Sequence, residues 1–147
     1  MKLPGIIFIF LILTTHGVSA QSGDITEILR QSAAMIQTGN FKDAEPLLRK
    51  ATTLAPRNAD AHNLLGIVLD QLGNATAAET EYKTAIRLNP QLVSPRANLG
   101  ILLAKNRRET EAIANFEAVL KLSPNHANTV INLGLLYVST KNYTKAV

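Results

Sequence analysis

The sequence of 147 residues contains no cysteine and no tryptophan, and only 5% of its residues are aromatic. Without cysteine, the chain can form no disulfide, no thiolate metal site and no cysteine nucleophile. Charged residues make up 18% and hydrophobic residues 46%, which is the balance of a chain that folds rather than one that stays disordered. Alanine and leucine are abundant instead, and both favour helices.

A strong charge of one sign is also lacking. The formal net charge is +4, and without residues 1–20 it is +3, because 14 Lys and Arg remain against 11 Asp and Glu. The most basic run, residues 105–108, is followed at once by Glu109 and Glu111. Nucleic-acid binding requires a basic face or tail, so no nucleic-acid partner is expected.

The first twenty residues have the three parts of a secretory signal peptide. Lys2 supplies a positive charge, residues 6–13 form an unbroken apolar run, and Val18 and Ala20 are small residues before a cleavage site. The alternative is an uncleaved anchor, but about 20 apolar residues are needed to cross a bilayer. Cleavage after Ala20 is therefore predicted. It leaves no integral membrane span and places the mature chain outside the cytoplasm, periplasmic or secreted.

From residue 24 onward the sequence repeats with a period of 34. Prolines, glycines, alanines and large apolar residues each recur at this interval, all in one register. Two helical patterns in each unit of this length are typical of stacked helical repeats. The recurring positions are Pro56, Pro90 and Pro124; Gly66, Gly100 and Gly134; Ala44, Ala78, Ala112 and Ala146; and Leu48, Tyr82 and Phe116.

These positions resemble the pattern of the tetratricopeptide repeat (TPR) family. The family's usual tryptophan at the fourth place is missing from every unit. The resemblance implies an all-α fold, a right-handed superhelical solenoid of antiparallel helix pairs whose first helices line a concave groove. The fullest match is in the second unit, with Leu65, Gly66, Leu69, Gly73, Ala78, Tyr82, Ala85 and Pro90.

The units can be placed along the chain. A short lead-in at 21–24 precedes a degenerate repeat at 25–58, repeats at 59–92 and 93–126, and a partial fourth repeat at 127–147. Asn58 and Asn74 stand where their side chains can cap the helices that follow. Helices are expected at 24–38, 41–54, 59–72, 75–88, 93–105, 109–121 and 127–139, with another beginning at 142.

The sequence ends early in the second helix of the fourth unit. A terminal repeat needs a polar outer face or a capping helix, and here Leu133, Leu136 and Tyr137 are expected to stay partly uncovered. Such a patch indicates a missing segment, an oligomer interface or a binding site. A longer protein that continues past Val147 is favoured, and self-association through the uncapped repeat is the second interpretation.

No set of residues indicates catalysis, a cofactor or a metal. The sequence has no glycine-rich phosphate loop, no nucleophile elbow and no His-Glu-x-x-His motif. His16 lies in the predicted signal, and His62 and His126 are far apart in sequence with no third ligand at a fixed spacing. A protein without enzymatic activity, cofactor or metal is therefore predicted.

The concave groove is the predicted binding site, because the first helix of each TPR unit exposes set places to it. Asn98 and Asn132 both occupy the sixth place, where a carboxamide can donate to and accept from an extended peptide backbone. The aliphatic residues Ile67, Ile101 and Leu135 lie beside them in the same register. The predicted groove residues are Asn63, Ile67, Asn98, Ile101, Lys105, Asn132 and Leu135.

Three functions follow from these observations. The first is a non-catalytic scaffold or adaptor that holds an extended segment of a protein partner. The second is the docking region of a longer secreted enzyme, and the third is a self-assembling module. The carboxylate clamp of chaperone-binding TPR proteins is rejected, because the corresponding places hold Leu29, Ala33, Leu64 and Asn98.

Overall fold

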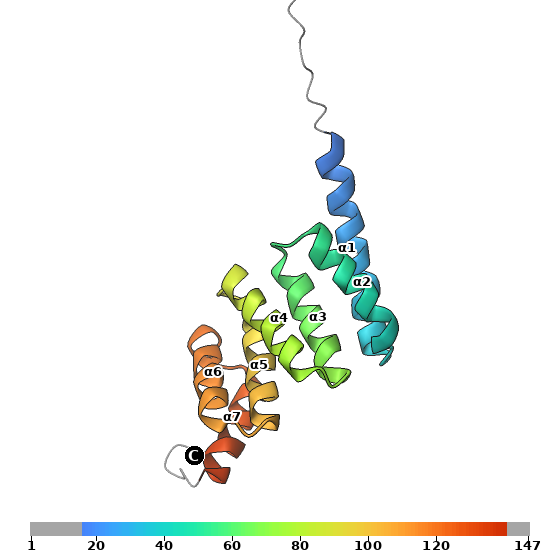
Figure 1. Cartoon of the computed structure of the whole chain (residues 1–147). Coiled ribbons are helices and arrows are strands. Elements are labelled where there is room, and N and C mark those ends of the chain that lie inside the picture. Colours follow the sequence, from blue (N-terminus) through green and yellow to red (C-terminus); the bar gives the residue numbers. More distant parts are fainter. Residues whose placement is uncertain (1–15, 141–147) are drawn as a thin grey trace, which may run out of the picture.

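A computed structural model describes residues 16–140 of the chain. Within this range the chain forms seven α-helices and no strand. Helices α1 to α6 form three antiparallel pairs, and these pairs and α7 stack side by side into a TPR-like solenoid (Figure 1). The predicted fold class is confirmed. The helices are α1 (His16–Gln37), α2 (Phe41–Leu54), α3 (Ala59–Gln71), α4 (Ala75–Leu88), α5 (Val93–Lys105), α6 (Glu109–Leu122) and α7 (Ala127–Ser139).

The helices from α2 to α7 begin where the sequence predicts and end within one residue of the predicted position. Helix α1 is different, because it begins at His16 rather than at residue 24. The predicted start of this helix at residue 24 is therefore wrong, and residues 21–24 lie within α1. No proline interrupts residues 16–24, and the glycines there cost a helix only about 1 kcal/mol each, so the helix extends through them.

The predicted signal peptide lies largely outside the described residues. Its apolar run at 6–13 is outside them, and the cleavage position predicted after Ala20 falls inside α1. The helix expected from residue 142 also lies outside the described part. Between residues 16 and 140, no helix is long and apolar enough to cross a membrane. The signal peptide and its cleavage stay predictions.

The two helices of each pair are joined by turns of one kind. Gly39 and Gly73 have positive φ angles of 75° and 83°, a conformation that costs glycine little. In the third pair Arg107 takes the same place with φ 58°, where a side chain is strained. The turn at Gly73 closes when the amide of Asn74 donates to the carbonyl of Leu69 at 2.8 Å, a bond that satisfies the end of a helix.

One of the two predicted asparagine caps is present. The side chain of Asn58 accepts a hydrogen bond from the amide of Ala61 at 3.0 Å, as a helix N-cap should. The cap predicted for the side chain of Asn74 is wrong. The backbone there has φ −87° and ψ 61° rather than the extended conformation of Asn58, and its side chain makes no capping bond.

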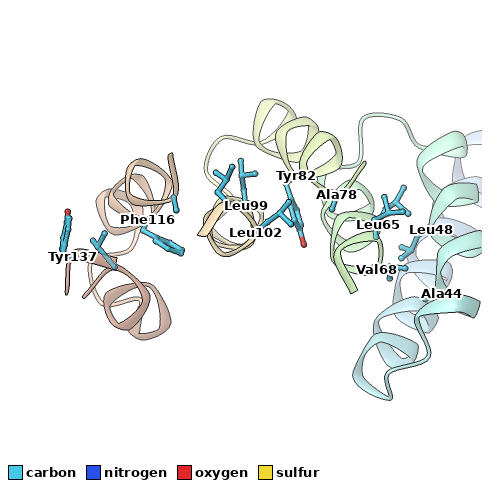
Figure 2. Close-up of a cluster of buried hydrophobic side chains, with 14 residues drawn as sticks. Ala44, Leu48, Leu65, Val68, Ala78, Tyr82, Leu99, Leu102, Phe116 and Tyr137 are labelled. Carbon is cyan, nitrogen blue, oxygen red and sulfur yellow. The ribbon is translucent and has the colours of Figure 1, made fainter. Parts of the chain in front are cut away.

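A continuous core of apolar side chains runs between the pairs (Figure 2). Close contact within a pair depends on a small residue facing a large one. A β-carbon added at Gly66 would meet the ring of Tyr82 at 2.6 Å, and one at Gly100 would meet the ring of Phe116 at 2.6 Å. The rings thus lie directly on the backbone of the facing helix. Other buried members are Ala44, Leu48, Leu65, Val68, Leu69, Leu99, Leu102 and Leu103.

Helix α7 ends the described stack and has an unusually apolar surface. Three residues were predicted to stay partly uncovered. Leu136 is partly exposed, but Leu133 and Tyr137 are buried, so the prediction is wrong for these two. Helix α6 holds α7 in place, and the hydroxyl of Tyr137 donates to Glu117 of α6 at 2.7 Å. The exposed apolar residues of α7 are instead Val130, Ile131, Leu135 and Val138.

Candidate functional site

The first helices of successive units, α3, α5 and α7, lie next to one another and form one face of the solenoid. Because the sequence repeats every 34 residues, Ile67, Ile101 and Leu135 occupy equivalent places on these three helices. The same holds for Asn98 and Asn132 on α5 and α7. The structure therefore aligns the predicted aliphatic residues across three neighbouring helices. Two hollows lie on this face, one between α5 and α7 and one between α3 and α5.

The first hollow lies between α5 and α7 and has a volume of about 210 Å³. Its walls are mostly apolar, and the carboxamide of Asn132 is its main neutral polar group. The side chain of Asn132 makes no hydrogen bond to the described residues, so its donors and acceptor are available. The lining residues are Ile101, Ala104, Lys105, Phe116, Asn132, Leu135 and Leu136.

The second hollow lies between α3 and α5 and has a volume of about 180 Å³. It is the more polar of the two, because a carboxylate and two carboxamides contribute to its walls. Ile101 and Lys105 line both hollows, so the two are adjacent. The lining residues are Ile67, Asp70, Gln71, Tyr82, Asn98, Ile101 and Lys105.

Asn63 is the one predicted groove residue that lines neither hollow. It is buried, with only 8% of its surface exposed, and its side-chain oxygen accepts a hydrogen bond from Asn98 Nδ2 at 3.1 Å. Asn63 thus holds the carboxamide of Asn98 in one orientation from behind. The place equivalent to Asn63 in the next unit is Ala97, so Asn132 has no such support.

Lys105, another predicted groove residue, is already paired. Its Nζ donates to Asp70 Oδ2 at 3.1 Å, and this bond joins α5 to α3 across the groove. The Asp70 side chain is only 14% exposed, whereas that of Lys105 is 53% exposed. The opposite charges therefore neutralise each other in the wall of the second hollow, and neither is a free charge for a ligand.

The two charged residues that line the hollows, Asp70 and Lys105, are bonded to each other, and the other lining residues include no histidine and no second carboxylate. Tyr82 lines the second hollow, but burial first and the charge of Asp70 second raise the pKa of its hydroxyl, which therefore stays neutral. In the described range, no group of three or more His, Asp or Glu side chains could hold a metal ion. What the groove offers is shape, apolar surface and carboxamides.

Several lining residues were missed by the sequence prediction. Phe116 and Tyr82 reach the hollows from the second helices α6 and α4, and Leu136 lies beside Leu135 on α7. The 34-residue spacing of Tyr82 and Phe116 was visible in the sequence. This spacing predicted that they are core residues. It did not predict that a buried ring also lines a hollow on the surface.

The sequence profile of the tetratricopeptide repeat matches residues 34–93 and 98–147. The chain belongs to the tetratricopeptide repeat family. Repeats of this family are generally non-catalytic modules of protein–protein interaction. No curated protein matches the chain.

Solved structures with the same fold are numerous. PilF of Pseudomonas aeruginosa is 26% identical and superposes with a TM-score of 0.79 over 86% of this chain, which spans 58% of the PilF structure. YrrB, a TPR protein with an unusual peptide-binding site, is 27% identical with a TM-score of 0.71, covering 88% of this chain and 67% of YrrB. The first TPR domain of Spaghetti (RPAP3), bound to the HSP90 peptide SRMEEVD, is 18% identical with a TM-score of 0.77, covering 82% and 95%.

Proposed function

We propose that this TPR protein is a non-catalytic scaffold that binds an extended segment of a partner protein in the groove across α3, α5 and α7. One observation carries the proposal: two adjacent hollows lie in line beside two carboxamides on equivalent places of α5 and α7. Carboxamides can pair with both the donors and the acceptors of a peptide backbone. Apolar hollows can receive its side chains.

The similar structures support a peptide ligand and also limit its chemistry. YrrB has a peptide-binding site, and the RPAP3 domain binds a peptide that ends in acidic residues. In the present groove Lys105 is paired with Asp70, and Leu64 is apolar where a clamp for a carboxylate would need a polar group. An acidic peptide such as SRMEEVD therefore serves as the negative control for binding.

The proposal places the scaffold outside the cytoplasm, periplasmic or secreted. Its basis is the order of Lys2, the apolar run at 6–13 and the small residues before position 21. The test is the amino terminus of the protein purified from its native source. A chain that begins at Gln21 supports secretion, and one that retains residues 1–20 in the cytoplasmic fraction contradicts it.

The groove is tested by the double substitution Asn98→Ala and Asn132→Ala. We expect partners captured by the wild-type chain from the extracytoplasmic fraction to be lost, while the helical circular dichroism spectrum persists. Asn125→Ala is the matched control, because Asn125 is an exposed carboxamide in the turn before α7. Equal capture by the wild-type and double-variant chains would rule out the groove.

Self-association is the second candidate, and the surface of α7 favours it. Ile131, Leu135 and Val138 follow one another at helical spacing and are 60%, 65% and 50% exposed. Helix α7 contains no charged residue that would repel a second copy. Ile131 lines neither hollow, so Ile131→Glu separates the candidates. A dimer in sedimentation velocity that this substitution dissociates supports self-association, and a wild-type monomer at high concentration excludes it.

A further inference from the structure

The two hollows are formed by equivalent residues of successive repeats. The distance between successive repeats therefore determines the spacing of the ligand side chains that can fill both hollows. Ile67 and Ile101 are equivalent residues on α3 and α5, and Ile101 and Leu135 are equivalent on α5 and α7. The centres of the hollows are therefore separated by about the distance between adjacent packed helices, 8–10 Å. A ligand that fills both hollows must present two side chains on one face at this distance.

An extended backbone meets this distance in one conformation. In a β-strand, side chains on one face are two residues apart, or about 7 Å. In a polyproline II helix, side chains on one face are three residues apart, or about 9 Å. Residues four apart on an α-helix are only about 6 Å apart along its axis. Residues seven apart on an α-helix are about 10 Å apart, close to the required distance, but the backbone groups between them are bonded within the helix.

The carboxamides require free backbone groups in the ligand. The side chain of Asn132 makes no hydrogen bond to the described residues. The side-chain nitrogen of Asn98 donates to Asn63, and the side-chain oxygen of Asn98 accepts no bond from the described residues. A polyproline II backbone makes no internal hydrogen bonds, so its carbonyl and amide groups can bond to both carboxamides. An α-helical ligand satisfies its own backbone and cannot use them.

The walls of the hollows also determine the side chains that fit. The α5/α7 hollow is the larger at about 210 Å³ and is lined by Ala104, Leu135 and Leu136. The α3/α5 hollow is smaller at about 180 Å³, and its charges, Asp70 and Lys105, are paired with each other. An apolar side chain matches the first hollow, and an uncharged side chain matches the second, more polar hollow.

The geometry points to a specific ligand class: an uncharged segment in the polyproline II conformation that inserts two side chains, three residues apart, into the two hollows. The side chain that enters the hollow between α5 and α7 is apolar. This inference rests on the proposed function and adds the conformation, spacing and charge of the bound segment.

The experiment pans a displayed library of random linear peptides against the purified full-length chain. We expect the enriched peptides to share two uncharged residues three apart, at least one of them apolar, with proline among their neighbours. A synthetic peptide with this pattern should bind at least tenfold more tightly, by fluorescence anisotropy, than versions with spacings of two, four or seven. Enrichment of another spacing, or of charged residues, would overturn the inference.

Substitutions separate this inference from the proposed function. Ala104→Phe fills the α5/α7 hollow and should weaken the synthetic peptide at least tenfold, and Leu135→Asp places a charge at its exposed rim with little risk to folding. Ala114→Phe is the control, because Ala114 is exposed on α6 and lines neither hollow.

Peptides of another spacing that Leu135→Asp abolishes would overturn the ligand class and leave the groove as the binding site. No enriched peptide at all would overturn both proposals. A dimer of the wild-type chain that Leu135→Asp dissociates would show that a second copy occupies the hollow, and this too would overturn the inference.

Discussion

The ring of Tyr82 on α4 lies against the backbone of α3 at Gly66, so that a β-carbon at residue 66 would come within 2.6 Å of Cε1. The third unit repeats the contact with Gly100 and Phe116. In the first unit the equivalent residues are Ser32 and Leu48, both fully buried. Ser32 is slightly larger than the glycines of the later units, and Leu48 is smaller than their aromatic residues. The two differences offset each other, so the helices of the first unit can also pack closely.

This contact predicts the effect of Gly66→Ala. Alanine is worth about 1 kcal/mol more than glycine in a helix interior, so propensity alone would stabilise the variant. The clash with Tyr82 acts in the opposite direction, and overpacking a dense core costs about 1–3 kcal/mol. The difference between the two effects is a loss of up to about 2 kcal/mol, measured as the free energy of unfolding in urea. A variant more stable than the wild type would contradict this.

The double variant Gly66→Ala with Tyr82→Leu reproduces the size relation of the first unit. If the two residues are directly coupled, the double variant should lose less stability than the sum of the single variants, by at least about 0.5 kcal/mol. Additive losses would mean that the β-carbon at residue 66 does not meet the ring. Combining Gly66→Ala with Phe116→Leu is the control, since Phe116 faces Gly100 instead.

Much of the fold was predictable because the repeat encodes it. The positions of Gly66, Tyr82 and Pro90 determine where helices pack closely and where they end, and six helices begin as predicted. The start of α1 was not predicted, because no residue near position 24 prevents the helix from beginning earlier in the chain. Pairwise contacts such as that of Gly66 with Tyr82 depend on side-chain direction, which a spacing does not specify.

His62 illustrates a contact that the sequence does not reveal. Its Nδ1 lies 2.6 Å from Glu81 Oε2 on α4, and its Nε2 lies 3.1 Å from the carbonyl of Pro56 in the turn before α3. Leucine at this position would fill space but leave the Glu81 carboxylate without this partner. A loss of about 1–3 kcal/mol is expected for His62→Leu in urea unfolding. Cleavage by protease at the turn of residues 55–58 should also become faster.

Arg96 provides the comparison, because it occupies the place of His62 in the third unit. Its Nε is buried with no hydrogen-bond partner in the described structure. Arg96→Leu removes no observed polar contact, so it should cost less stability than His62→Leu. If the two substitutions cost the same, the contacts of His62 with Glu81 and Pro56 contribute nothing measurable.

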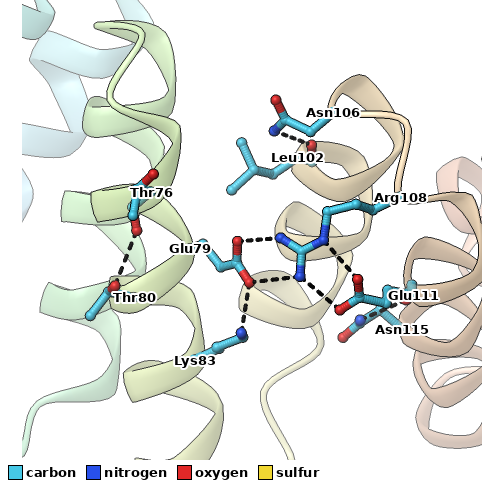
Figure 3. Close-up of polar contacts among 9 residues, drawn as sticks. All are labelled: Thr76, Glu79, Thr80, Lys83, Leu102, Asn106, Arg108, Glu111 and Asn115. Carbon is cyan, nitrogen blue, oxygen red and sulfur yellow. Dashed lines mark hydrogen bonds and ion pairs between the residues drawn. The ribbon is translucent and has the colours of Figure 1, made fainter.

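A network of charged side chains joins α4 to the beginning of α6, the second helices of two successive units (Figure 3). Arg108 donates to Glu79 at 2.6 Å and to Glu111 at 2.7 Å, and Lys83 lies 2.6 Å from Glu79. The hydrogen bond from Arg108, and then that from Lys83, lowers the pKa of Glu79 below its ordinary value of 4.5. The charged form of Glu79 is therefore stabilised in the folded state.

This network predicts a pH dependence with a definite sign. A carboxylate whose pKa is depressed by folding contributes stability above pH 4.5, and the contribution is lost as the pH falls below it. The difference in unfolding free energy between the wild type and Glu79→Gln should therefore be largest near pH 7 and should shrink below pH 4.5. Glu109→Gln is the control, since Glu109 makes no side-chain bond among the described residues, and a constant difference for Glu79→Gln would refute the assignment.

The groove was predictable in part. Six of the seven predicted residues line one or both hollows, because the repeat places Ile67, Ile101 and Leu135 on one face. The sequence also placed Asn63 and Lys105 in the groove, but it did not predict their partners. The structure shows that both already bond to residues one unit away, Asn63 to Asn98 and Lys105 to Asp70. Such bonds join residues 35 positions apart and follow from the superhelix rather than from the period.

The attachment of α7 gives a second pH dependence, of opposite sign. Burial, followed by the hydrogen bond to Glu117, raises the pKa of Tyr137 from 10.0 to about 12. Folding thus favours the protonated phenol, so its contribution is complete below pH 10 and is lost as the pH rises toward 12. In urea unfolding, the advantage of the wild type over Tyr137→Phe should fall by up to about 3 kcal/mol over this interval. Taking the difference cancels the contribution of Tyr82, which both chains retain. An advantage that stays constant up to pH 12 would mean that the phenol of Tyr137 is hydrated and that α7 is held to α6 by apolar contacts alone.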